Sequence, residues 1–219
     1  INDMFEKYND SDDVYIIAEV GQNHQGDLPT AKKYVEEFTR LGANAIKFQM
    51  RNNEYLFSEE AFNRPYDNEN SFGKSYGEHR NYLEFSDDEW IELRNLCKQL
   101  NVDFMCTPFD EPSLQHLISL DVDLLKVSSF DLANIPLLSK ICASGKPIVV
   151  SVGGGKLHHI ESTIQYLQHN DADFALLHCV SEYPCPVNKL GLGFIAKLKQ
   201  QHPTLTVGLS DHFNGILSG

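Results

Sequence analysis

Basic residues are scarce in this chain of 219 residues. It has 18 lysines and arginines against 31 aspartates and glutamates, which gives a formal net charge of −13. Such a surface should repel nucleic acid and anionic membranes, because both carry negative charge. The sequence therefore predicts neither kind of partner, and an anionic ligand would need a locally basic pocket.

Paired cysteines and long apolar runs are also missing. The five cysteines contain no CxxC pair and are odd in number, which indicates reduced thiols in a cytoplasmic compartment rather than disulfides or a zinc site. We expect Cys97, Cys106 and Cys142 to be small core residues. No apolar run is long enough to span a bilayer, and the polar, acidic opening INDMFEKYNDSDD does not resemble a secretory signal.

The most informative stretch is VYIIAEVGQNHQGDL, residues 14–28. The apolar, β-branched run from Val14 to Ala18 is typical of a parallel strand covered on both faces. Glu19 then places a carboxylate where that strand should end, and a polar, glycine-rich turn follows. In an α/β barrel, chemistry is placed at this end of the strands. A surface loop whose glycines only make the turn would explain the same residues.

The rest of the chain alternates between strand and helix patterns. We expect further strands over residues 44–49, 102–106, 123–127, 147–150, 173–178 and 204–209, and helices over residues 29–41, 86–100, 111–120, 136–144, 158–169 and 192–201. Without a linker or internal repeat, these predict one domain, residues 1–219, of consecutive βα units with a parallel sheet. A complete eight-unit barrel usually needs about 250 residues. We therefore expect its eighth βα unit to lie beyond residue 219.

One connection is unusually long. Arg51 to Phe85 contains no predicted helix, and long excursions of this kind tend to be lids or binding loops. It contains Lys74, Tyr76, His79 and Arg80 within a few residues. A solvated loop would explain those charges equally well.

Polar side chains gather where the predicted parallel strands end, and those ends share one rim. The polar residues at these strand ends are Glu19, Lys47, Gln49, Thr107, Lys126, Ser129, Asp131, Ser151, Ser181, Tyr183, Ser210, Asp211 and His212. Two lysines, several hydroxyls and the glycines at 153–155 describe a cradle for an anion such as phosphate. A buried lysine is costly without a negative partner, so Lys47 either faces solvent or waits for an anion. Carboxylate and imidazole groups add candidates for proton transfer or a divalent metal.

The motifs at these positions resemble the sialic acid synthase family. In order, they are IAEVGQNHQGD, IKFQ, the lid segment RPY...SFGKSYGEHRNYLEFS, CTPFD, LLKVSSFD, HCVSEYP and VGLSDH, and the resemblance covers Tyr15 to Gly219. The family condenses phosphoenolpyruvate with an N-acetylated aldose, such as N-acetylmannosamine, to a nine-carbon 2-keto acid with release of phosphate. The resemblance therefore implies a metal-dependent transferase that forms a carbon–carbon bond on an α/β fold, a (β/α)8 TIM barrel.

The resemblance also implies roles for the rim residues. Positions that hold phosphoenolpyruvate are matched by Lys47, Thr107, Lys126, Ser129, Ser151, Ser181 and Ser210. Positions near the reacting sugar are matched by Glu19, Gln49, Asp131 and Tyr183, with Glu19 a candidate for proton transfer. His212 matches one of two histidines that bind manganese or magnesium. The second histidine is expected beyond residue 219, as is an antifreeze-like domain that reaches into the partner's site in a homodimer.

Some residues depart from the family pattern. In KVSSF, Ser128 and Phe130 replace two glycines, and SVGGG stands where STGM is common. Asp131 and Ser181 have Glu and Asn as common alternatives, which leaves the acceptor open among N-acetylmannosamine, its 6-phosphate and the legionaminic and pseudaminic precursors. Two other functions stay open: a non-catalytic barrel that binds a phosphorylated ligand, and an aldolase with Lys126 as Schiff-base nucleophile.

Overall fold

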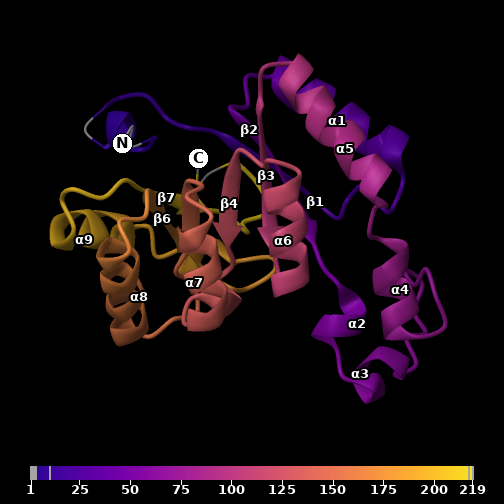
Figure 1. Ribbon diagram of the computed structural model, residues 1–219. Helices are drawn as coiled ribbons and strands as arrows, with labels where there is room; N and C mark the ends of the chain where they lie inside the picture. The colour runs from indigo at the N-terminus through magenta and orange to yellow at the C-terminus, as the bar shows by residue number, and fades with distance from the viewer. Residues whose placement is uncertain (1–3, 10, 217, 219) are drawn as a thin grey trace. The chain divides into compact units, whose positions relative to one another are not determined.

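The computed structural model describes residues 4–9, 11–216 and 218 (Figure 1). It divides into two compact units. Unit 1 comprises residues 1–14 and 125–219, and unit 2 comprises residues 15–124. Among the described residues, no helix has both the length and the apolar character needed to cross a membrane.

Unit 2 is built on three parallel strands that follow one another in chain order: β1 (Ile17–Gly21), β2 (Ala45–Met50) and β3 (Asp103–Pro108). Its longer helices are α1 (Leu28–Arg40), α5 (Asp87–Gln99) and α6 (Glu111–Ser119). Figure 1 shows α1 and α5 side by side. A capping box of Ser86 and Glu89 starts α5, and Trp90 anchors that helix in the core at 2% exposure.

The register of unit 2 decides which side chains meet. Glu19 pairs with Lys47, and Gln49 pairs with Thr107. Because side chains alternate along a strand, all four lie on one face of the sheet. The sequence pattern therefore gathered four polar residues that the structure places on one face of the sheet.

Strand β1 begins three residues later than predicted, so the expected span from Val14 to Ala18 was wrong. Val14 and Ile16 are 74% and 53% exposed, whereas Val20 is fully buried. The apolar residues at the start of this stretch are therefore exposed, and the chain enters the core only near Val20. Glu19 consequently lies inside β1 rather than after it, and Gly21 is the strand's last residue.

The long connection, residues 51–85, is hereafter called the lid. It contains three short helices that the sequence analysis did not identify: α2 (Asn53–Leu56), α3 (Glu59–Asn63) and α4 (Tyr76–Tyr82). Figure 1 shows them grouped together. Ser75 and Glu78 form a capping box at the start of α4. This S-x-x-E spacing was the sequence signal that would have predicted the helix.

The lid has its own aromatic core. Tyr76 packs against Phe57 and Tyr66, with ring centroids 5.2 and 5.4 Å apart, and Phe72 stacks on Tyr82 at 4.6 Å. A bridge between Pro65 and Ser75 closes the intervening loop. The lid is therefore an ordered substructure, and Arg80 on α4 has a fixed place in it.

Unit 1 contains four parallel strands in chain order: β4 (Leu124–Val127), β5 (Ile148–Ser151), β6 (Phe174–Cys179) and β7 (Val207–Ser210). Its α-helices are α7 (Ile135–Ala143), α8 (Leu157–His169) and α9 (Gly193–Gln201), and its short 3-10 helices are η1 (Glu6–Tyr8), η2 (Ser129–Asp131) and η3 (Val187–Lys189). Phe5 anchors the N-terminal segment, because its side chain is buried and its carbonyl accepts the Thr206 hydroxyl at 2.7 Å.

Register again gathers the polar residues of unit 1 on one face. Lys126 pairs with Val149, and Ser151 lies two residues further along β5. Ser151 pairs with Leu177, and Cys179 pairs with Ser210. Lys126, Ser151, Cys179 and Ser210 therefore share a face.

The predicted fold class is confirmed: parallel strands alternate with helices in an α/β arrangement, and the helices predicted between strands end within one residue of the observed ones. Cys97 and Cys106 are fully buried, as predicted. Cys142 is only partly buried, so its assignment to the core was wrong. Cys142 lies in the last turn of α7, where its side chain partly faces solvent. The single-domain organisation and the residues expected beyond 219 remain predictions.

Candidate functional site

Lys47 and Glu19 form an ion pair on the polar face of unit 2. The side chain of Lys47 is 15% exposed and that of Glu19 is 40% exposed. Lys47 therefore does not face solvent, and its negative partner is Glu19. The charge of Glu19 stabilises the partly buried ammonium group of Lys47. This face of unit 2 therefore offers a ligand one cation, Lys47, and one anion, Glu19.

Gln49 connects this ion pair to Arg51. Its Nε2 donates to Glu19 Oε1 at 3.0 Å, and its Oε1 accepts from Arg51 Nη2 at 2.8 Å. The Arg51 guanidinium also lies 3.8 Å from the ring centroid of Phe109. Thr107, the register partner of Gln49, is buried at 3% exposure. The four predicted residues of unit 2 thus lie on one face, and Arg51 joins them.

Sequence reasoning missed a buried carboxylate, Glu84, at the end of the lid. It accepts from the backbone N–H of Arg51 at 3.1 Å and from Gln22 Nε2 at 2.9 Å. Burial raises the pKa of Glu84 to about 7, although the Arg51 hydrogen bond and the charges of Arg51 and Arg80 oppose the shift. The only sequence signal was a glutamate flanked by Leu83 and Phe85, both of which are buried.

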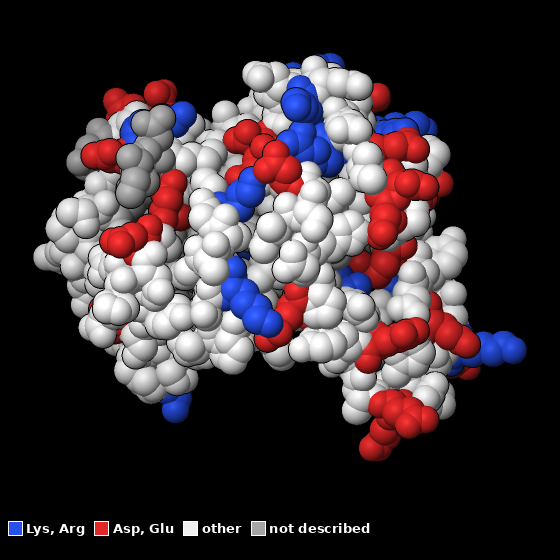
Figure 2. All heavy atoms as spheres, viewed as in Figure 1, with Lys and Arg blue, Asp and Glu red and all other residues white. Residues whose placement is uncertain are grey.

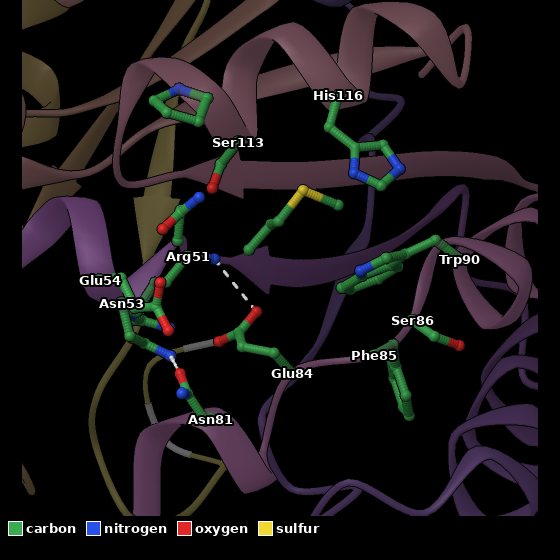
Figure 3. A pocket seen from close by; sticks show the side chains of 13 residues that line it. Arg51, Asn53, Glu54, Asn81, Glu84, Phe85, Ser86, Trp90, Ser113 and His116 are labelled. Atoms are coloured by element: carbon green, nitrogen blue, oxygen red, sulfur yellow. Dashed lines mark hydrogen bonds between the residues drawn. The ribbon is translucent and has the colours of Figure 1, made fainter. Parts of the chain in front are cut away.

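Glu84 borders a pocket of about 440 Å³, shown in Figure 3. Met50, Phe85 and Trp90 contribute apolar surface, and the polar lining comes from Arg51, Asn52, Asn53, Glu54, Asn81, Glu84, Ser86, Ser113 and His116, with Pro112 completing the wall. Asn53 donates to Asn81 at 2.9 Å, which ties α2 to α4. The outer side of the lid is acidic: Figure 2 shows acidic side chains over α3, whose first turn holds Glu59 and Glu60.

In unit 1, Lys126 and Ser151 bring buried donors to one face. Lys126 is 5% exposed, and its Nζ donates to the Val127 carbonyl at 2.6 Å. Ser151 is 2% exposed, and its hydroxyl has no hydrogen-bond partner among the described residues. A buried hydroxyl without a partner is costly. The pair fits the predicted anion cradle.

The glycine run at 153–155 packs against the end of β6. A Cβ atom on Gly153 would lie 2.8 Å from the Cys179 carbonyl and 2.9 Å from Ser181 Oγ. Only glycine permits this approach without a shift. The turn therefore brings its backbone beside Ser181, one of the predicted site residues.

Cys179 is a further rim residue that the sequence reasoning did not assign. Burial raises the pKa of its thiol, but hydrogen bonds with His212 and Ser129 and the charges of His212 and Lys126 outweigh burial and lower it. The hydrogen bond with Cys179 is also the main reason that the pKa of His212 is raised. The signal was available, because period-two alternation from Leu177 places Cys179 on the polar face.

The imidazole of His212 fits a divalent metal as one ligand. Its Nδ1 lies 2.8 Å from the Val180 carbonyl, so that nitrogen must donate, which leaves Nε2 free to bind a metal. The ring of Tyr183 lies 4.0 Å from the His212 ring, between centroids. Within the described residues, no cluster of three or more histidines, cysteines or acidic residues could hold a metal.

The other predicted residues of unit 1 occupy varied surroundings. Asp131 is buried and accepts from Ser128 Oγ at 2.8 Å and Asn134 Nδ2 at 3.0 Å, so its carboxylate supports the local turn. Tyr183 is 74% exposed. Their roles beside a sugar remain predictions. On the lid, Lys74 is exposed, whereas His79 is buried against Tyr66 and Phe72.

Three comparisons connect this chain to known proteins. It is 41% identical to N-acetylneuraminate-9-phosphate synthase of Drosophila melanogaster, over 94% of this chain and 56% of that protein. It is 37% identical to N,N'-diacetyllegionaminic acid synthase of Campylobacter jejuni, over 92% of this chain and 61% of that protein. The crystal structure of a sialic acid synthetase from Leptospira borgpetersenii, in complex with citrate, matches with a TM-score of 0.82 and 35% identity, covering 94% of this chain and 67% of that one.

The chain spans little more than half the length of the curated relatives it matches. The NeuB family model matches residues 34–218, most of the sequence. This confirms the resemblance inferred from the strand-end motifs. The chain therefore belongs to the NeuB family.

Proposed function

We propose that the protein containing this chain condenses phosphoenolpyruvate with an N-acetylated aldose to a nine-carbon 2-keto sugar acid. The observation that carries the proposal is the buried ammonium of Lys126 on the same face as the unpartnered Ser151 hydroxyl. Two desolvated donors of this kind suit the phosphate or carboxylate of phosphoenolpyruvate, since charge-assisted hydrogen bonds to an anion are strong where water is excluded. The family membership and the names of the relatives support the same reaction class.

Lys47, Lys126 and the hydroxyls hold phosphoenolpyruvate, and their fixed charges compensate its negative groups throughout the reaction. C3 of phosphoenolpyruvate attacks the aldehyde carbon of the open-chain sugar. Water then adds at C2, and collapse of that intermediate releases phosphate. Glu19, whose carboxylate is held by Lys47 and Gln49, moves the proton to or from the reacting sugar.

A metal completes the proposal. When bound, manganese or magnesium supplies Lewis-acid polarisation of a carbonyl oxygen. Nε2 of His212 is the group of this chain that would hold the metal, because Nδ1 is committed to the Val180 carbonyl. We also propose a cytoplasmic homodimer, supported by the family resemblance and by cysteines that form no CxxC pair.

The proposal is tested by phosphate release from phosphoenolpyruvate in the full-length protein. N-acetylmannosamine, its 6-phosphate and legionaminic and pseudaminic precursors are offered in turn, because the fly relative is named for a 9-phosphate product. Phosphate release should require an acceptor and a divalent metal, and Lys47→Ala should abolish it. Lys32→Ala is the matched control, since Lys32 also pairs with a glutamate, Glu92, but on the helical surface.

Two outcomes would overturn the proposal. One is phosphate release at the same rate with and without every acceptor. The other is a stable adduct with pyruvate on borohydride reduction at Lys126, which would show Schiff-base chemistry instead.

A further inference from the structure

Two glutamines of unit 2 each bridge a carboxylate and a guanidinium. Gln49 donates to Glu19 at 3.0 Å and accepts from Arg51 at 2.8 Å. A carboxylate only accepts and a guanidinium only donates. The Gln49 amide can therefore satisfy both neighbours in one orientation alone. Rotated by half a turn, it would set oxygen against Glu19 and NH2 against Arg51.

Gln22 is held in the same way, between Glu84 and Arg80. Its Nε2 donates to Glu84 Oε1 at 2.9 Å, and its Oε1 accepts from Arg80 Nη1 at 2.9 Å. Arg80 comes from the lid helix α4, and Gln22 follows β1 directly. The lid is thus tied to the end of β1 by charged hydrogen bonds, which are stronger than neutral ones.

Arg51 and Glu84 join the two bridges. Glu84 Oε2 accepts from the backbone N–H of Arg51 at 3.1 Å, the bond drawn between them in Figure 3. The same Arg51 uses its side chain to orient Gln49. A continuous chain of hydrogen bonds therefore runs from Arg80 on the lid through Gln22, Glu84, Arg51 and Gln49 to Glu19.

We propose that Glu84, Arg51 and Gln22 are positioning residues that fix the Gln49 amide, and through it the Glu19 carboxylate, for the acceptor sugar. This inference rests on the proposed function, in which Glu19 and Gln49 face the acceptor. None of the three needs to touch substrate. Their effect is to remove rotational freedom from Gln49, which would otherwise leave Glu19 without its donor for part of the time.

The energetics agree with an orienting role. Burying Glu84 is costly, because a desolvated carboxylate loses hydration that its partners only partly replace. Arg51 also lies in a desolvated position, where burial and the neighbouring Arg80 lower the pKa of its guanidinium to about 10. Surface pairs would tie down the lid at a lower cost. Burial of Glu84 and Arg51 instead limits the competition of water for the bonds that these two groups make to the amides.

The test is steady-state kinetics of the full-length protein with Arg51→Met and Glu84→Gln. We expect kcat/KM for the acceptor to fall about tenfold to hundredfold, as for a misaligned reacting group, with KM for phosphoenolpyruvate unchanged. Arg51→Lys should recover part of the loss, because it restores a donor to Gln49. Arg64→Met and Glu78→Gln are the matched controls. Arg64 stacks on Tyr76 and Glu78 caps α4, and neither residue belongs to the chain of hydrogen bonds from Arg80 to Glu19. They should leave acceptor kinetics unchanged.

A crystal structure of Arg51→Met without substrate gives a readout that does not depend on turnover. We expect the Gln49 side chain in a second orientation or weakly ordered. Gln49 fixed as in the parent protein would overturn the inference, as would equal losses for both substrates or equal effects of the controls. Failure of the proposed function looks different, because the parent protein would then show no acceptor-dependent phosphate release at all.

Discussion

Gly21 lies so close to Glu19 that a Cβ atom placed on it would come 2.9 Å from Glu19 Oε1. The same atom would lie 3.3 Å from Gln49 Nε2, so it would crowd both ends of the hydrogen bond that holds the carboxylate. Gly21 also has a φ of 57°, in the left-handed region that favours glycine. The glycine does more than make a turn, since it leaves room for the Glu19–Gln49 contact.

Gly21→Ala, compared with a control glycine, should therefore separate the cost of the left-handed backbone from the crowding of Glu19 and Gln49. We expect a loss of roughly 1–2 kcal/mol in the free energy of unfolding from the left-handed backbone, and a drop of about tenfold or more in acceptor kcat/KM from the displaced carboxylate. Gly145→Ala is the control, because Gly145 has a φ of 67° and nothing within 4 Å of its Cβ position. Equal kinetic effects of the two substitutions would show that crowding at Glu19 does not matter.

Lys126→Ala should weaken the binding of phosphoenolpyruvate. We expect a loss of about 2–4 kcal/mol, as for a buried charge pair that loses one partner, measured by titration calorimetry. Lys74→Ala on the lid should cost much less, because Lys74 is exposed. Lys189→Ala is a second control, since that lysine pairs with Glu182 at 2.9 Å on the surface. Small and equal losses in all three variants would contradict the assignment of Lys126.

His212→Ala should abolish manganese-supported condensation in the full-length protein while leaving the fold intact. A catalytic metal with few protein ligands is sensitive to the loss of one. Activity is measured with and without chelator, manganese binding by electron paramagnetic resonance, and folding by circular dichroism. The metal assignment fails if both chelation and the substitution leave activity unchanged.

The sequence predicted the helices between strands well, and within each unit it predicted which strand residues of the rim share a face. Lys47 and Gln49 reach one face by alternation along β2 alone, whereas Lys126 and Ser151 also need the parallel pairing of β4 with β5, in which Lys126 lies opposite Val149. The start of β1 could not be placed, because an exposed apolar run at residues 14–16 looks like a buried one in sequence. The burial that distinguishes them comes from tertiary packing.

The hydrogen-bond chain through Arg51 and Glu84 was also beyond prediction. Its members come from three separate segments, and each is an ordinary polar residue in its own neighbourhood. Only the folded lid, with its own aromatic core, brings Arg80 to Gln22. The lid's charges were visible in the sequence, but their partners were not.

His24 should add an acid-sensitive contribution to the stability of the protein. It is 1% exposed and stacks on Phe85, with centroids 4.2 Å apart. Burial lowers its pKa from 6.5 to about 4, against a weaker opposing effect of the Gly21 backbone. The unfolded state then binds more protons between pH 6.5 and 4, so the free energy of unfolding falls as the pH drops through that range, by on the order of 3 kcal/mol.

This acid sensitivity is checked by chemical unfolding at several pH values. His24→Gln cannot ionise, so its free energy of unfolding relative to the parent should increase by on the order of 3 kcal/mol as the pH drops from 6.5 to 4. His169→Gln, on an exposed residue in the last turn of α8, is the control and should show no such increase relative to the parent. An unchanged pH dependence in His24→Gln would contradict the assignment.

Glu84 should act in the opposite direction over nearly the same range. Its pKa rises from 4.5 to about 7 through burial, in a setting that also includes Arg51, Arg80, Asp110 and Cys106. Between these values the folded state keeps a proton that the unfolded state has released. The free energy of unfolding therefore falls as the pH rises, by on the order of 3 kcal/mol, and the full loss is present above pH 7.

The two groups offset one another in the parent protein, so each becomes visible only when the other is removed. Glu84→Gln stays neutral at every pH, and its free energy of unfolding relative to the parent should increase by on the order of 3 kcal/mol between pH 4.5 and 8. Glu78→Gln, which changes an exposed capping carboxylate on the lid, should show no such increase. A difference between Glu84→Gln and the parent that stays constant across this range would show that the Glu84 carboxyl does not hold its proton in the folded protein, and that its bonds to Arg51 and Gln22 suffice to keep it charged.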